Sequence, residues 1–286
     1  EIQRTEKICN TKIAECRNLI VKQLGEMGKM SSHIADEIKY ATNYDFDCEK
    51  RIINALQRNE IYIYDAVVVK NQYDMLDVTL YTHKNYDKEK MNEILRIISK
   101  ETGQRMQLYS AHTGNKKNSM RELHFVVRPQ VKIHAEALCM PAAGNQLSGD
   151  SYCFMDLPDG RTFLVLSDGM GTGRRASEQS NAVVRLMELY VKSGIDISSA
   201  VSMVNMMLTS GAADVMTASI DICSVNRHEK RALFVKMGAM PSVIVGPERS
   251  RVIEINQPPA GVTSELNDLY CKMTECEVAP GECIVL

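Results

Sequence analysis

The chain has 286 residues, a length that corresponds to about two domains at roughly 150 residues each. Its 34 lysines and arginines nearly balance 36 aspartates and glutamates, and the resulting net charge of −2 argues against a nucleic-acid-binding protein that depends on a positive surface. With 44% hydrophobic and 24% charged residues, the chain can bury a sizeable core and is not a disordered tail.

The first predicted element is a long regulatory or dimerisation helix over residues 1–44, a stretch without proline. Apolar or small residues recur along it at steps of three, four or seven: Ile13, Cys16, Ile20, Met27, Met30 and Ile34. A narrow seam of this kind suits packing between helices. The helix packs either on its own domain or against a second copy of the chain in a homodimer.

Residues 45–129 are predicted to form a small regulatory domain with the element order αββαββ, which makes it an α+β fold. Helices are expected over residues 48–59 and 87–102, the second with Asp87 as N-cap and Gly103 at its C-terminal end. The expected strands cover residues 65–70, 76–82, 105–111 and 121–128. This segment contains no constellation of reactive groups.

The third segment, residues 130–286, begins after Pro129. Strands are expected at its start and again after about residue 215. Two helices are expected between them, over residues 176–192 and 197–208.

One hairpin in this segment carries the chemistry. The sequence Leu157-Pro158-Asp159-Gly160-Arg161 is typical of a three-residue hairpin loop, with proline and glycine at the positions that such a turn favours. In that register Leu157 faces Arg161, and the same pairing continued along both strands places Asp150 opposite Asp168.

Two opposed aspartates, with Cβ atoms about 4.5–5.5 Å apart, repel one another unless a cation lies between them or one is protonated. Carboxylates are hard ligands that suit Mg²⁺ or Mn²⁺. A pair of them can bridge two divalent ions that activate a water and clamp a phosphoryl group. The simpler alternative is two exposed strand-end aspartates, one at a turn and one at the start of a loop.

A glycine-rich sequence, Gly169-Met170-Gly171-Thr172-Gly173, follows between a strand and a helix, where nucleotide-binding loops lie. It matches neither G-x-G-x-x-G nor G-K-[ST], because Arg174 stands where the last glycine belongs, so we do not expect a nucleotide site. We expect instead a sharp bend at which the Gly169 carbonyl can serve as a metal ligand. Arg174 and Arg175 either meet phosphate or form a solvated face.

Nine cysteines without a C-x-x-C pair and six histidines without H-E-x-x-H spacing favour free thiols over disulfides or a zinc site. No apolar run approaches the roughly 18 residues that cross a bilayer, and we expect no signal peptide in the residues given. Because the chain opens on Glu1 rather than Met, we expect a piece of a longer protein.

Four stretches between residue 131 and the end resemble one family in their order and spacing: Ser148-Gly149-Asp150-Ser151, Ser167-Asp168-Gly169-Met170-Gly171-Thr172-Gly173, Lys236-Met237-Gly238-Ala239-Met240-Pro241-Ser242 and Pro259-Ala260-Gly261-Val262. The resemblance is to the stage II sporulation protein E family, metal-dependent serine/threonine phosphatases of the bacterial PP2C type. The upstream helix and α+β segment resemble the regulatory region of that family.

This resemblance implies a PP2C-like αββα sandwich, two antiparallel sheets flanked by helix pairs, for residues 130–286. It implies two ions, Mn²⁺ or Mg²⁺, held by Asp150, Asp168 and the Gly169 carbonyl, with the two aspartates as the catalytic residues. A metal-activated water would dephosphorylate a partner, a phosphorylated anti-anti-sigma factor, and so activate a sporulation sigma factor. The family also implies a cytoplasmic portion of a membrane-anchored protein that associates with cell-division proteins.

The family pattern continues with a further S-D-G aspartate and another acidic residue, but this sequence stops in the strand after Glu282. We therefore expect a phosphatase domain truncated at its C-terminus, with an incomplete metal site. Two rival functions remain: a related stress-response or signalling phosphatase, and a catalytically idle scaffold that dimerises and recruits division proteins. Near the motifs, Asp221 is expected to be structural and Lys236 to be solvated.

Overall fold

The structure is a computed structural model that describes residues 43–70, 74–113, 120–141, 147–171, 173–209, 217–262 and 271–286. The helix expected over residues 1–44 lies outside the described residues up to residue 42. Its expected last two residues belong instead to a two-residue strand, β1 (Asn43–Tyr44). Within the described residues, no helix is long and apolar enough to cross a membrane.

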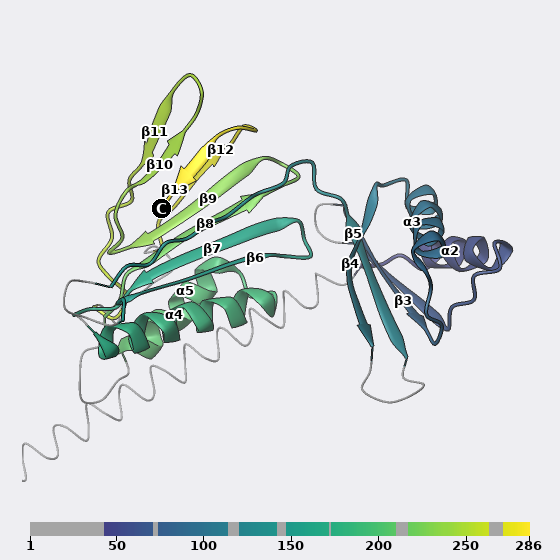
Figure 1. Ribbon diagram of the computed structural model, residues 1–286, viewed down its shortest axis with the longest axis horizontal. Helices are drawn as coiled ribbons and strands as arrows, with labels where there is room; N and C mark the ends of the chain where they lie inside the picture. The colour runs from purple at the N-terminus through teal and green to yellow at the C-terminus, as the bar shows by residue number, and fades with distance from the viewer. Residues whose placement is uncertain are drawn as a thin grey trace, which may run out of the picture. The chain divides into compact units, whose positions relative to one another are not determined.

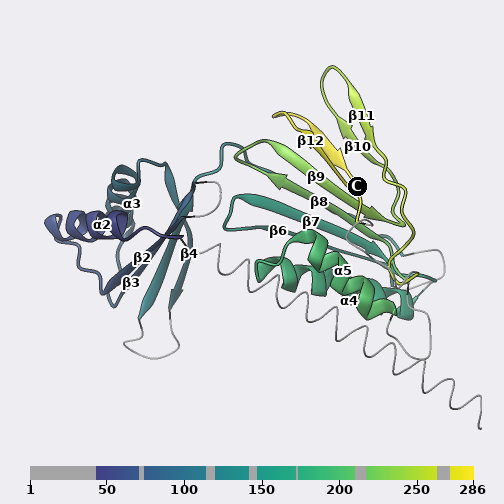
Figure 2. The same ribbon diagram turned by 180° about the vertical axis from the view of Figure 1, so that it is seen from behind.

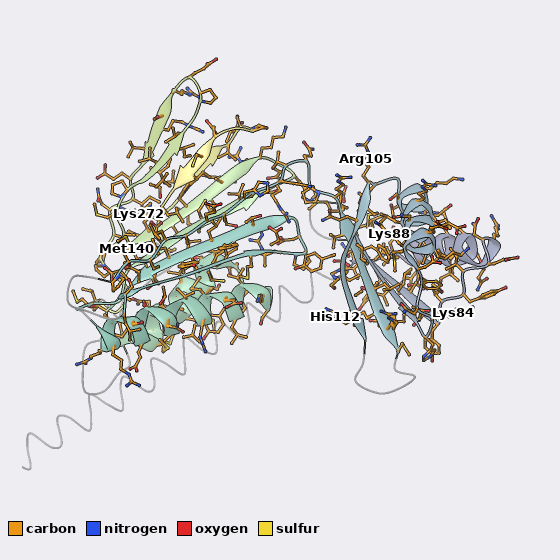
Figure 3. The ribbon with its side chains drawn as sticks, in the orientation of Figure 1. Lys84, Lys88, Arg105, His112, Met140 and Lys272 are labelled. Carbon is orange, nitrogen blue, oxygen red and sulfur yellow. The ribbon has the colours of Figure 1, made fainter. Side chains whose placement is uncertain are left out.

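The first part of the described chain is an antiparallel five-stranded sheet in the order β1-β2-β3-β5-β4, with two helices on one face (Figure 1). Its remaining elements are α2 (Phe46–Arg58), β2 (Asp65–Lys70), β3 (Leu76–Thr82), α3 (Lys88–Thr102), β4 (Met106–Thr113) and β5 (Arg121–Val127). The buried side chains of both helices form one apolar cluster with those of the sheet. In Figure 3, Arg105, the exposed residue before β4, points into solvent.

The helix ends of this α+β part lie close to where the sequence places them. The Asp87 carboxylate accepts a hydrogen bond from the Lys90 N–H at 2.8 Å, as an N-cap does, and Gly103 closes α3 in the left-handed conformation at φ 69°. Asp45 caps α2 in the same way, accepting from the Cys48 N–H at 2.9 Å. The predicted order αββαββ is confirmed, with β1 added before the first helix.

The second part of the chain contains two antiparallel sheets and one pair of helices within its described residues. The larger sheet has the order β12-β9-β8-β7-β6 and the smaller sheet the order β11-β10-β13. The elements are β6 (Asp150–Asp156), β7 (Arg161–Asp168), α4 (Arg174–Lys192), α5 (Ile197–Thr209), β8 (Ile220–Asn226), β9 (Arg231–Met237), β10 (Ser242–Val245), β11 (Ser250–Ile253), β12 (Met273–Glu277) and β13 (Cys283–Val285).

The larger sheet is covered on both faces, and this explains why β8 is buried along almost its whole length. Helices α4 and α5 pack on one face through an apolar cluster that includes Phe163, Met187 and Val204. A second cluster, which includes Phe234 and Ile244, fills the space between the two sheets. Figure 2 shows the same layers from behind: the helix pair, the larger sheet and the smaller sheet.

The mixed α+β fold with antiparallel sheets is as expected, while three details differ. The strands expected directly after Pro129 are not found in residues 130–141 and 147–149, and the first strand of this part begins at Asp150. Helix α4 begins two residues earlier than expected, at Arg174. Of the two helix pairs of the expected αββα sandwich, the described residues contain one.

Candidate metal centre

Asp150 and Asp168 face one another at the open end of the β6–β7 hairpin. Asp150 is the first residue of β6 and Asp168 the last residue of β7, and the two are direct cross-strand partners. The pairing runs without a bulge from Asp156 and Thr162 to the two aspartates. The juxtaposition predicted from the sequence is therefore confirmed.

The hairpin loop determines this register. The Leu157 N–H donates to the Arg161 carbonyl at 2.7 Å, and the Gly160 N–H donates to the Leu157 carbonyl at 3.1 Å. Gly160 has φ 83°, a left-handed conformation that glycine adopts without strain. The Asp159 carboxylate accepts from the Arg161 backbone N–H at 3.0 Å and fixes the turn further.

The Asp150 carboxylate affects the ionisation of Asp168. The pKa of Asp168 is raised above its ordinary value, first by partial burial and then by the charge of Asp150 and a hydrogen bond with it. The Ser148 hydroxyl donates to the Asp150 carboxylate at 3.2 Å and accepts from the Asp150 N–H at the same distance. These contacts orient the Asp150 carboxylate.

Gly169 continues directly from Asp168 and is held by the backbone on several sides. Its N–H donates to the Gly149 carbonyl at 3.2 Å, and the Ser219 N–H donates to the Asp168 carbonyl at 2.9 Å. A Cβ atom at Gly169 would lie 2.0 Å from the Ala176 carbonyl oxygen, in the first turn of α4. Only glycine fits this approach between the loop and the helix.

The donors at this site are all hard oxygen atoms. The position of a Cβ on Gly149 would be 3.3 Å from Asp168 Oδ1 and 3.7 Å from the Gly169 carbonyl oxygen, so both oxygens lie over the same glycine. Two carboxylates and a carbonyl suit Mg²⁺ or Mn²⁺ rather than a metal that prefers nitrogen or sulfur. The described part of the chain contains no group of three or more His, Cys, Asp or Glu side chains that could hold a metal.

Other residues near Asp150 and Asp168 have surroundings that the structure defines. Arg174, at the start of α4, is 84% exposed and forms an ion pair with Glu178 at 2.8 Å, so it belongs to a solvated face. Cys139 lies close enough to Asp150 that the carboxylate, after burial, raises the pKa of its thiol. Its neighbour Met140, labelled in Figure 3, is 71% exposed. All seven cysteines within the described residues are free.

A buried ion pair between Asp221 and Lys236 is the feature that the sequence did not reveal. The Lys236 side chain is 0% exposed and that of Asp221 is 4% exposed. The Lys236 ammonium donates to both Asp221 oxygens and to the Met240 carbonyl, each at 2.7 Å. The expectation that Lys236 is solvated is wrong, whereas Asp221 is structural as expected. Burial is the main influence on the Asp221 carboxyl and raises its pKa against the opposing effect of Lys236.

Residues 158–286 match the family model described as Stage II sporulation protein E (SpoIIE). Stage II sporulation protein E of Bacillus subtilis (strain 168) is 24% identical over 256 residues, 90% of this chain and 31% of the relative. The protein of the same name from Priestia megaterium is 23% identical over 256 residues, 88% of this chain and 43% of the relative. The chain thus spans less than half the length of these curated relatives.

A solved structure supports the fold over a longer stretch. The structure of the PP2C phosphatase domain and a fragment of the regulatory domain of the cell fate determinant SpoIIE from Bacillus subtilis has a TM-score of 0.64 and 22% sequence identity. The likeness covers 95% of this chain and 79% of the other. The expected PP2C-type fold and the resemblance to the stage II sporulation protein E family are confirmed.

Proposed function

We propose that this chain is the catalytic portion, with its regulatory segment, of a metal-dependent protein serine/threonine phosphatase of the stage II sporulation protein E family. The observation that carries the proposal is the opposition of Asp150 and Asp168 beside the closely packed Gly169. The fold match and the relatives' names support it.

In this proposal the chain's own residues prepare a site for divalent cations. Asp150, oriented by Ser148, and Asp168, with its raised pKa, present two carboxylates that are more stable with a cation than without one. The Gly169 carbonyl adds a neutral oxygen from a loop that cannot move away from α4 without breaking its packing. When bound, two Mn²⁺ or Mg²⁺ ions would lower the pKa of a water and neutralise charge on a phosphoryl group.

The substrate proposed is a phosphoserine on a phosphorylated anti-anti-sigma factor, whose dephosphorylation would activate a sporulation sigma factor. The names of the relatives, which place them in sporulation, support this choice over a stress-response or signalling substrate. We also propose that the portion is cytoplasmic, that the full-length protein is anchored in a membrane, that residues 1–44 form a homodimer seam, and that cell-division proteins are among its partners.

The test is carried out in the full-length protein with p-nitrophenyl phosphate and with a phosphoserine protein as substrates. Asp150→Asn and Asp168→Asn should each abolish Mn²⁺-dependent activity, because each removes one charged ligand while keeping the shape of the side chain. Asp159→Asn is the matched control, since it removes a carboxylate from the tip of the same hairpin and should retain activity. Undiminished activity in either of the first two variants would contradict the proposal and favour the scaffold alternative.

A further inference from the structure

A short segment, residues 257–261, here called the strap, pairs with the backbone beside the candidate metal centre. The Ala260 N–H donates to the Ala218 carbonyl at 3.0 Å, and the Ala218 N–H donates to the Ala260 carbonyl at 3.1 Å. Ala218 pairs on its other side with Gly169. A ladder of three residues, Gly169, Ala218 and Ala260, therefore connects the strap to the proposed carbonyl ligand.

The strap is held at both of its ends. At the first end, the Gly238 N–H donates to the Gln257 carbonyl at 2.9 Å, and a Cβ at Gly238 would lie 2.5 Å from Pro259 Cγ. At the second end, the Gly261 N–H donates to Asn205 Oδ1 at 2.7 Å. Since Asn205 is a residue of α5, this bond ties the helix directly to the strap.

Asn205 is an unusual choice for its position if packing were its only purpose. It is 2% exposed and lies on a helix whose other buried positions include Val201, Val204 and Leu208. Burying an amide is costly unless it is hydrogen-bonded, whereas an apolar side chain there would join the surrounding core at no such cost. The bond to Gly261 gives the amide a function that an apolar residue could not supply.

We propose that Asn205 is a positioning residue for the metal centre: it holds the strap, and through the ladder it sets the place of the Gly169 carbonyl. A ligand misplaced by about an ångström can lower the reaction rate some hundredfold. A small displacement of the ladder is therefore enough to affect the metal centre. The inference rests on the proposed function in one respect: it takes a metal ion as the ligand of the Gly169 carbonyl. The ladder and its anchor are independent of that function.

The first test measures amide hydrogen exchange in the metal-free 286-residue protein. Asn205→Leu, which is close in size and removes the acceptor, should speed exchange of the Ala218, Ala260 and Gly261 amides at least tenfold relative to the amides of β8. Val204→Ala is the matched control: it weakens the packing of α5 at the adjacent buried position without touching the Gly261 bond. It should speed exchange across the core without singling out the ladder.

The second test introduces the same substitutions into the full-length protein and titrates each variant with Mn²⁺, with the concentration of free ion as the readout. Asn205→Leu should bind Mn²⁺ at least fivefold more weakly than the unsubstituted chain, and Val204→Ala should remain within twofold of it. If Asn205→Leu does not fold, Asn205→Ser, which is too short to reach Gly261, takes its place in both measurements.

Equal exchange patterns in Asn205→Leu and Val204→Ala, or unchanged Mn²⁺ affinity in Asn205→Leu, would overturn the positioning role. Absence of Mn²⁺ binding by the unsubstituted full-length protein would overturn both the proposed metal centre and the role of Asn205 toward it. The exchange measurement would then still decide whether Asn205 holds the ladder, so the two failures are distinguishable.

Discussion

At the scale of single residues, the opposed aspartates place a cost on the metal-free fold. The pKa of Asp168 is raised in the folded chain by burial and by Asp150. A raised pKa means that the stability contributed by the protonated carboxyl is fully present below the unfolded pKa of about 3.9 and is lost as pH rises through the folded value. Whenever both carboxylates are ionised they repel one another.

Asp150→Asn should therefore make the metal-free protein more stable at neutral pH, although it removes a proposed ligand. We expect a gain of about 0.2–1 kcal/mol, the range for like charges on directly opposed strand positions, toward the lower end because Asp168 is exposed to solvent. The gain should vanish near pH 3. Urea unfolding in the presence of EDTA at both pH values measures it.

Added Mn²⁺ should reverse the order of the two proteins, because the native pair binds the ion and the variant has lost one charged ligand. A variant that is less stable than the native chain in EDTA at neutral pH would show that the aspartates attract rather than repel, as they would if one of them shared its proton with the other throughout that range.

At the scale of elements, the loop after β7 and the first turn of α4 are packed against one another through a glycine. Gly169→Ala would bring a Cβ to within 2.0 Å of the Ala176 carbonyl oxygen, so the helix or the loop must shift. We expect a loss of about 1–3 kcal/mol, typical of overpacking, together with weaker Mn²⁺ binding. Thermal unfolding of the 286-residue chain measures the stability, and Mn²⁺ titration of the full-length protein measures the affinity.

Gly171→Ala is the control in the same loop. Gly171 has φ 99°, and a Cβ added there would meet no atom of the described residues within 4 Å, so this change introduces left-handed strain of about 1–2 kcal/mol without a collision. It should lower stability while leaving Mn²⁺ affinity nearly unchanged. Equal losses of affinity in the two variants would mean that loop strain, and not the packing on α4, governs the metal centre.

Local chemistry made much of this architecture predictable. The strands Asp65–Lys70 and Leu76–Thr82 have the predicted bounds, because alternation and flanking turn residues define them within a few residues of chain. The Asp150–Asp168 pairing was predictable for a similar reason, since one loop of known type determines the register of both strands.

The features that could not be predicted from the sequence depend on contacts between segments that are far apart in the chain. The two-residue strand β1 exists only because Asn43 and Tyr44 pair with Lys70 and Val69. The burial of Lys236 depends on Asp221, which lies on the neighbouring strand and has no spacing that marks it as a partner. The ladder from Gly169 to Ala260 joins residues nearly a hundred positions apart.

At the scale of the whole molecule, the apolar seam predicted for residues 1–44 raises the question of how the metal centre is regulated. We hypothesise that this helix sets the position of the α4–α5 pair and thereby affects metal binding through Gly169. Met27→Glu combined with Met30→Glu should disrupt the seam, because a charge in an apolar helix contact is costly. In the full-length protein, the Mn²⁺ concentration for half-maximal activity should shift at least threefold.

Ser32→Glu is the matched control, since residue 32 lies on the opposite side of the predicted helix and should leave that concentration unchanged. If the double variant also keeps both the Mn²⁺ requirement and the turnover rate of the native protein, the helix serves only for assembly. A change in oligomeric state without a change in activity would support that outcome.

The buried pair of Asp221 and Lys236 has a consequence for how this protein can change over evolutionary time. Losing either partner alone leaves an uncompensated buried charge, which costs about 3–5 kcal/mol, a large part of the 5–15 kcal/mol that typically stabilises a domain. Replacing both residues together with apolar residues of similar volume avoids most of that cost. Descendant sequences should therefore keep both residues or neither, and lineages that retain only one should be rare.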